Sequence, residues 1–211
     1  KKLDGTTQEW YILGADSGVS GDNTIIFAAS PIATVQKFDS SSTNKTDSNL
    51  WSECNYGGAS VTEVFANHYG ASELRAVLKG MTDGSNTSCF TTAEQGLMND
   101  TTVTTTDKKN RKTYTTTDKL YALAADGAGD SYKIIKAGSE NRPVLAIRNY
   151  CNSGEGFWMR SPNDSFSYAS LYAWPGHKVN YNDVYTYAAV QPASNLKLSS
   201  VLFASAAMAT S

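Results

Sequence analysis

Two apolar runs near the C-terminus decide the fold prediction: GFWMRSP at residues 156–162 and AAVQPASNLKLSSVLF at residues 188–203. Both contain the aromatic and branched side chains that are typical of β-strands. The segment between them is rich in tyrosine, asparagine, serine and histidine. Tyrosine supplies rigid contact area, and asparagine and serine supply adaptable hydrogen bonds, as in antibody binding loops. We therefore expect this stretch to form a recognition surface on a rigid scaffold.

The N-terminal part of the sequence predicts an early β-hairpin. Trp10–Leu13 and Thr24–Ala28 are β-rich runs, and the loop between them is rich in glycine, aspartate and serine. The threonine-rich residues Thr101–Thr117 show no apolar face and predict an exposed excursion or a flat edge hairpin. We also expect the first strand to lie beside the last strand, near Leu196–Phe203.

Two short helices are predicted in the middle of the chain. Ser72 precedes a helix over Glu73–Lys79, which Gly80 ends. Thr91 and Glu94 form a capping-box pattern that begins a second helix near Thr92–Met98, with Ala93 and Leu97 facing inward. Together these elements predict a single α+β domain over residues 1–211, with a twisted antiparallel sheet, two short helices and long irregular loops.

Composition narrows the functional classes. The 211 residues are 40% hydrophobic and 18% charged, which fits a globular protein. The net charge of −2 argues against a nucleic-acid partner, because such binding needs a basic stripe. The cluster Lys108-Lys109-Asn110-Arg111-Lys112 is interpreted as a solvated turn. No apolar run is long enough to span a bilayer, so we expect no direct membrane insertion of this domain.

The titratable side chains do not form a familiar catalytic or metal motif. Cys54, Cys89 and Cys151 are too far apart for a compact metal site, and we expect buried thiols, with one disulfide and one free thiol as the alternative. Two distant histidines, His68 and His177, offer too few ligands for zinc or copper. We therefore predict no cofactor, no metal and no catalytic residues.

Several motifs occur in one order along the chain: W-Y-I-L-G, F-T-T-A-E-Q, F-W-M-R-S-P and V-Q-P-A-S-N-L-K-L-S-S-V-L-F. Together they resemble a family of bacterial domains of uncharacterised function found in large surface proteins of Gram-positive gut anaerobes. The resemblance implies an extracellular or cell-surface location and a domain excised from a longer protein. The usual ending has V-R-P-A, whereas this chain has Gln191 at the arginine position, so an ion pair made by that arginine would be missing.

That family is similar in turn to the C-type-lectin-like fold, which includes formylglycine-generating enzymes and the variable proteins of diversity-generating retroelements. In those variable proteins the diversified, ligand-facing residues precede the final strands, and Ser165–Tyr187 resembles such a segment in position and composition. The motifs of calcium-dependent lectins are incomplete here: Gln191-Pro192-Ala193 lacks the acid, and Tyr181-Asn182-Asp183 has tyrosine in place of tryptophan. Formylglycine-generating enzymes need paired cysteines, and Cys151 has no partner near it in sequence.

The leading prediction is a non-enzymatic adhesion or binding module that recognises a protein or glycan ligand. The alternatives are a calcium-dependent lectin, an enzyme that uses Cys151, and a structural spacer. In Phe157–Arg160, Trp158 is expected to be buried and Arg160 to tie nearby carbonyls or an acid, with an anion-binding Arg160 as the alternative. The predicted binding surface comprises Tyr168, Tyr172, Trp174, His177, Asn180, Tyr181, Asn182, Asp183, Tyr185 and Tyr187.

Overall fold

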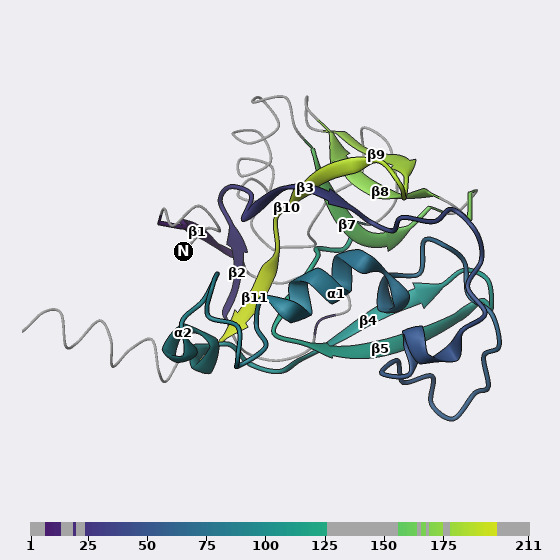
Figure 1. The fold of residues 1–211 in the computed structure, drawn as a ribbon, viewed down its shortest axis with the longest axis horizontal. Helices are drawn as coiled ribbons and strands as arrows, with labels where there is room; N and C mark the ends of the chain where they lie inside the picture. The colour runs from purple at the N-terminus through teal and green to yellow at the C-terminus, as the bar shows by residue number, and fades with distance from the viewer. Residues whose placement is uncertain are drawn as a thin grey trace, which may run out of the picture.

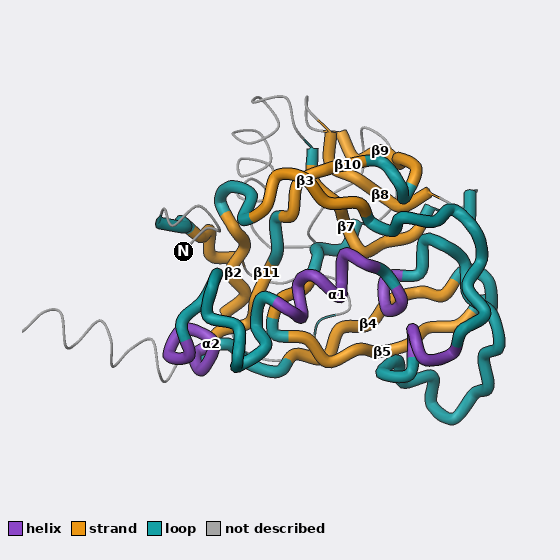
Figure 2. Tube along the Cα trace, viewed as in Figure 1, coloured by secondary structure: helices purple, strands orange, loops and turns teal. Residues whose placement is uncertain are grey.

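Strands prevail over helices in the computed structural model, which describes residues 7–13, 19, 24–125, 156–163, 166–167, 169–174 and 178–197 (Figures 1 and 2). One sheet has the order β1-β2-β11-β6, with strands at Trp10–Leu13, Thr24–Ala28, Ala193–Leu196 and Leu120–Tyr121. A second has the order β3-β10-β7-β8-β9, with strands at Ala33–Lys37, Tyr187–Val190, Phe157–Pro162, Ala169–Trp174 and Lys178–Asp183. The third is the hairpin of β4, Thr101–Asp107, and β5, Lys112–Asp118. The predicted mixed α+β class is therefore confirmed.

Both predicted helices are present, at α1, Glu73–Gly80, and α2, Thr92–Leu97. The Ser72 hydroxyl accepts a hydrogen bond from the Arg75 backbone N–H, which caps α1, and the capping box at Thr91 is formed. In the view of Figure 1, α1 lies between β3 and the β4–β5 hairpin. Two 3₁₀ turns, η1 at Ser48–Trp51 and η2 at Tyr69–Ala71, precede it.

The first helix ends at the predicted residue: Gly80 is the last helical residue, and Met81 follows in a right-handed conformation. One detail of the second helix prediction is wrong. In α2 the inward-facing side chain is Gln95, whereas Ala93 is exposed. The Gln95 amide donates to the backbone carbonyls of Phe90 and Asn86, at 3.0 and 2.7 Å, and so joins the helix to the loop before it.

The early hairpin is confirmed, because β1 and β2 pair antiparallel from Trp10–Ala28 to Leu13–Ile25. The expected contact between the first and last strands is wrong for β11: β2 lies between β1 and β11 in the same sheet. Residues 198–203 of the expected last strand lie outside the described residues.

The strand β7 connects the two larger sheets through its side chains. Phe157 packs against Phe27 of β2, with ring centroids 5.6 Å apart, and Trp158 packs edge-on against Phe38, at 5.7 Å. All of Phe157–Arg160 is buried, so β7 has a packed surface on both of its sides. Its pairing with β10 is parallel, whereas the other strand pairs in the described residues are antiparallel.

The threonine-rich hairpin is not an exposed excursion. Its two strands pair without interruption from Thr101–Asp118 to Asp107–Lys112. Alternate residues are buried, and the buried side includes Asp107, Tyr114 and Asp118. A hairpin without an apolar stripe is buried here because its inward polar groups have partners on α1 and on the segment before it.

Candidate functional site

The turn between β9 and β10 is fixed to the body of the domain. Val184 is fully buried in the main core, and its carbonyl accepts a hydrogen bond from the Asp39 backbone N–H at 2.9 Å. The Thr186 N–H donates to the Asp183 carbonyl at 2.8 Å, which closes the turn. Side chains on either side of Val184 are therefore presented from a rigid backbone.

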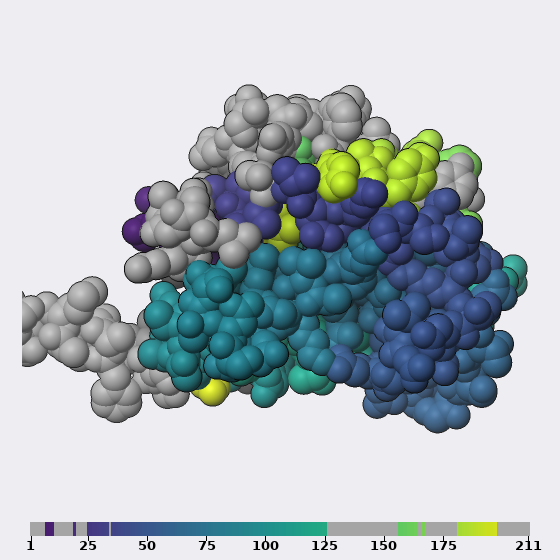
Figure 3. Space-filling model, in the orientation of Figure 1, coloured from purple at the N-terminus to yellow at the C-terminus, as the bar shows by residue number. Residues whose placement is uncertain are grey.

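Four large aromatic side chains around this turn are exposed, and we call them the aromatic patch: Phe166, Tyr181, Tyr185 and Tyr187. Their exposed fractions are 38%, 45%, 45% and 61%. A contiguous apolar patch on a monomer surface often marks an interaction site, whereas single exposed apolar side chains are normal. Figure 3 shows the yellow-green residues near the C-terminal end of the chain at the surface beside the blue-violet segment that contains β3.

Each side chain of the patch has an identifiable support. The Phe166 N–H donates to Asn163 Oδ1 at 2.9 Å, and its carbonyl accepts from Asn67 Nδ2 at 3.0 Å. The Phe166 ring packs on Tyr181, with centroids 5.3 Å apart. The Tyr185 hydroxyl donates to Asp183 Oδ2 at 2.6 Å.

Tyr187 lies beside the edge of the five-stranded sheet. It pairs in register with Lys37 of β3, whose ammonium lies 5.0 Å from the centre of the Tyr187 ring. This distance allows a cation–π interaction, which holds the lysine side chain against the ring.

The predicted site also contains five residues whose side chains are not among those described. Tyr168 and His177 lie outside the described residues, and for Tyr172, Trp174 and Asn180 the backbone is described. Positions 172 and 180 are opposite each other in the β8–β9 register. Alternate positions of a strand belong to opposite sides of a sheet, so 172, 174, 180 and 182 form one set, and 181 and 183 form the other. That all ten residues form one binding surface stays a prediction.

Asn182 has a structural role in the turn. Its side-chain oxygen accepts hydrogen bonds from the Asp183 N–H at 2.9 Å and from the Thr186 hydroxyl at 3.4 Å. Asp183 is also half-buried, and its Oδ2 accepts the hydrogen bond from the Tyr185 hydroxyl.

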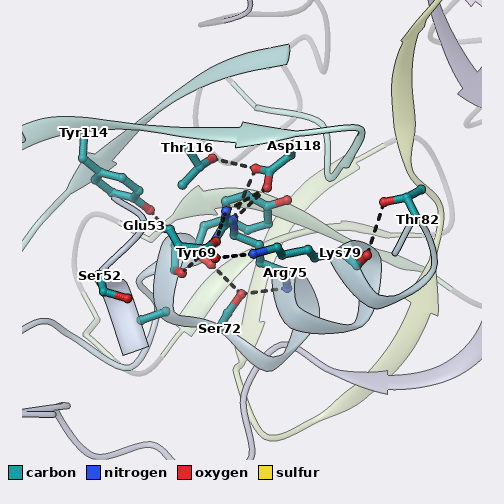
Figure 4. Close-up of polar contacts among 12 residues, drawn as sticks. Ser52, Glu53, Tyr69, Ser72, Arg75, Lys79, Thr82, Tyr114, Thr116 and Asp118 are labelled. Carbon is teal, nitrogen blue, oxygen red and sulfur yellow. Dashed lines mark hydrogen bonds and ion pairs between the residues drawn. The ribbon is translucent and has the colours of Figure 1, made fainter. Parts of the chain in front are cut away.

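A polar cluster, separate from the aromatic patch, lies beneath the β4–β5 hairpin (Figure 4). Arg75 of α1 forms ion pairs with Asp118 at 2.9 Å and Glu53 at 3.0 Å, and Lys79 also contacts Glu53. Burial opposes the charge of Arg75, but the buried Asp118 outweighs it and raises the arginine pKa. The hydrogen bond from Lys79 is the largest influence that lowers the pKa of Glu53. The cluster joins α1 to the hairpin.

A hydrogen-bonded relay runs beside this cluster, from His68 through Tyr56 to Asp107. Tyr56 Oη lies 2.7 Å from His68 Nε2 and donates to Asp107 Oδ2 at 2.7 Å. Because His68 Nδ1 accepts the Ala71 N–H at 3.1 Å, the neutral ring carries its proton on Nε2. Burial is the main cause that lowers the pKa of His68 to about 4.

The relay and its neighbours support a structural role. His68 is only 2% exposed and stacks on Tyr114, with centroids 4.2 Å apart. Cys54 lies nearby, but burial raises the pKa of its thiol to about 12, so the thiolate that nucleophilic chemistry needs is scarce at neutral pH. Cys151, the residue of the enzyme alternative, lies outside the described residues.

Arg160 is buried and bonds to a backbone carbonyl, as predicted from the sequence. Its side chain is 1% exposed and donates from Nη1 to the Ala122 carbonyl at 2.7 Å. Gln191, at the position where the family ending has arginine, is also buried and donates to the Ala28 carbonyl at 2.6 Å. The glutamine, which lies in the link between β10 and β11, thus joins that link to β2 by a neutral hydrogen bond.

Sequence reasoning missed Phe166 and the relay. Phe166 lies inside the aromatic segment, and its place two residues before Tyr168 was the available signal. The relay joins residues 56, 68 and 107, whose spacing carries no signal, because folding alone brings them together. In the described part of the chain, no group of three His, Cys, Asp or Glu side chains is arranged to hold a metal ion. Nor does any helix described here have the length and apolar character to cross a membrane.

Residues 59–198 match the sequence model of a family described as Domain of unknown function (DUF6273). The matched range includes α1, the β4–β5 hairpin and the whole aromatic patch, and it begins after β3. Comparisons with curated proteins and with solved structures found no match.

Proposed function

The chain belongs to the DUF6273 family, and we propose that it is a non-enzymatic binding module that recognises a protein or glycan ligand through the aromatic patch. The observation that carries this proposal is Tyr185. Its ring is 45% exposed, yet the turn beneath it is anchored by buried Val184, and its hydroxyl is bonded to Asp183.

An exposed ring that is already fixed loses little conformational entropy when a partner covers it. Tyrosine and tryptophan are also the residues most enriched among the energetically dominant positions of interfaces. The patch therefore has the two properties that favour binding: apolar area that is available to a partner, and side chains that are positioned in advance.

We further propose that the domain has a C-type-lectin-like fold and acts in adhesion at a bacterial cell surface or in a secreted protein. The mixed α+β architecture, the two short helices and the motif order support this proposal. The proposed mode of binding uses no cofactor, no nucleic acid and no membrane insertion. The resemblance to variable proteins of diversity-generating retroelements predicts that related sequences differ most between residues 165 and 187.

The first test removes two rings of the patch together, with Tyr181→Ala and Tyr185→Ala in one variant. Labelled wild-type domain and variant are compared on a glycan array and on immobilised surface proteins. We expect the wild-type domain to bind a defined subset and the variant to lose that binding. Stability should change by no more than about 0.5 kcal/mol for each substitution, as for other exposed positions.

Leu50→Ala is the matched control, because Leu50 is 48% exposed and lies outside the patch. This variant should bind as the wild type does. Unfolding of the double variant would show that the rings are structural, and unchanged binding would place the site elsewhere. Loss of binding on calcium removal would favour the lectin alternative, and an absence of any wild-type binding would favour the spacer.

A further inference from the structure

An acidic side chain lies within the aromatic patch. Tyr181 and Asp183 are alternate residues of β9, so they lie on the same side of that strand. The Tyr185 hydroxyl reaches Asp183 Oδ2 at 2.6 Å, and the Phe166 ring packs on Tyr181. The order along the surface is therefore Phe166, Tyr181, Asp183, Tyr185, with one carboxylate between two half-exposed tyrosine rings.

The electrostatics of this arrangement favour a positive charge. The faces of aromatic rings carry negative potential and attract cations within about 6 Å of the ring centre. A carboxylate beside the rings adds a full negative charge. The rings and the carboxylate therefore both attract a positively charged ligand that lies over them.

The chain already places its own cations on aromatic rings that are exposed or half-buried. The Lys37 ammonium lies 5.0 Å from the centre of Tyr187, in the same patch, and Lys109 lies 5.4 Å from the centre of Phe65. Lys37 therefore has an aromatic partner in Tyr187. Lys178 begins β9, at the opposite end of that strand from Asp183.

We propose that the partner of the patch is a protein segment that places an arginine side chain over Tyr181 and Tyr185 and pairs it with Asp183. This inference rests on the proposed function and specifies its ligand. Arginine fits better than lysine because its planar guanidinium can stack on a ring and donate several N–H groups to a carboxylate at the same time. The Tyr185 hydroxyl holds Oδ2 in place and leaves Oδ1 of Asp183 to accept from the guanidinium.

The test uses small probes and the intact domain. Acetyl-arginine amide is titrated into labelled protein, and the backbone amide NMR signals of residues 181–187 are followed. The probe should cause saturable shifts there, and its uncharged isostere, acetyl-citrulline amide, should cause none. Asp183→Asn should weaken arginine binding about tenfold, which corresponds to the loss of one charge-assisted hydrogen bond.

Tyr185→Phe tests how the hydroxyl positions the carboxylate. It keeps the ring but releases Asp183 Oδ2, so the arginine probe should bind more weakly than to the wild type, though more tightly than to Asp183→Asn. Leu50→Ala, at an exposed position outside the patch, should bind the probe as the wild type does. Tyr181→Leu keeps apolar bulk but removes the ring potential, and it should weaken binding of the arginine probe. Amide signals dispersed as in the wild type verify that each variant is folded.

Three outcomes would overturn the arginine proposal: equal binding of the citrulline probe, unchanged binding in Asp183→Asn, or no saturable shift up to the solubility of the probe. Tetramethylammonium is a further probe, because it carries charge without N–H donors. Binding as tight as that of arginine would assign the site to quaternary ammonium groups instead. If the Tyr181 and Tyr185 double variant loses ligand binding while Asp183→Asn retains it, the binding module stands and only the arginine partner is rejected.

Discussion

Burial is the main cause that lowers the pKa of His68 and keeps it neutral, and hydrogen bonds at both of its ring nitrogens fix the tautomer. Nδ1 accepts the Ala71 N–H, and Nε2 donates to Tyr56, which in turn donates to Asp107. A proton added at Nδ1 would face the Ala71 N–H, which is also a donor. The charged groups around the ring act in opposite directions, since Asp107 favours the protonated form whereas Lys45 and Arg75 oppose it.

This environment predicts that acid destabilises the protein through His68. Burial lowers the pKa of His68 from 6.5 to about 4, so the unfolded chain binds the proton more readily than the folded protein. The contribution to stability is complete above pH 6.5 and is lost progressively as the pH falls toward 4. The full loss is roughly 3 kcal/mol at the low end of this range. Urea unfolding measured at a series of pH values checks it.

His68→Asn is the informative variant for this test. Asparagine can still accept the Ala71 N–H as a cap, but it does not titrate. The free energy of unfolding of this variant should depend little on pH between 6.5 and 4.5. Glu53 and Glu63 have lowered pKa values, so their effects fall below that window. A pH dependence equal to that of the wild type would contradict the assignment to His68.

At the scale of elements, the short turn η2 depends on a glycine that the sequence does not distinguish from others. A β-carbon on Gly70 would overlap Cys54 Sγ and would lie 2.9 Å from a ring carbon of Tyr114. Neither Gly80 nor Gly96 has any heavy atom within contact distance of an added β-carbon, and both lie in helices. Of these three glycines, only Gly70 lacks room for a side chain, because it lies against Cys54 and against Tyr114 of the hairpin.

This difference predicts opposite effects of the same substitution. Gly70→Ala should destabilise the protein by about 1–3 kcal/mol, as overpacking does. Gly96→Ala should stabilise it by about 0.5–1 kcal/mol, because alanine is the better helix former. Adding Cys54→Ala should recover part of the loss at Gly70. Thermal unfolding of the variants measures these changes, and equal effects at the two glycines would contradict the structure.

For the β4–β5 hairpin, the sequence predicts the strand pairing but not the burial. Alternation of threonines indicates a hairpin, and the pairing is regular. The sequence does not indicate burial, because the partners of Asp118 and Asp107 are Arg75 and Tyr56, on segments far away in the chain. The helices were predictable because the capping residues Ser72 and Thr91 act on N–H groups within three residues.

At the scale of the whole molecule, the predictability of the candidate site differs from residue to residue. The exposure of Tyr181, Tyr185 and Tyr187 agrees with the composition of their segment. Small polar residues around a ring supply little apolar surface against which it could be buried. The support beneath them was not predictable: Val184 and the Asp39 bond connect the turn to a segment at the opposite end of the sequence. The sheet order was likewise beyond local signals, because β2 pairs with both β1 and β11.

The contact between the two larger sheets makes a prediction about cooperativity. Phe157 of β7 packs on Phe27 of β2 and is fully buried, so Phe157→Ala should destabilise the protein by about 3–5 kcal/mol. Leu50→Ala, at an exposed position, should change stability by no more than about 0.5 kcal/mol. Hydrogen exchange of amides in β2 and β10 reports on the two sheets separately. Because β7 pairs with β10 in one sheet and packs through Phe157 on β2 of the other, both sets of amides should lose protection in the same urea transition. Phe157→Ala should shift both midpoints together. Loss of protection in β10 at a lower urea concentration than in β2 would mean that the sheets unfold independently, contrary to the prediction of a single domain.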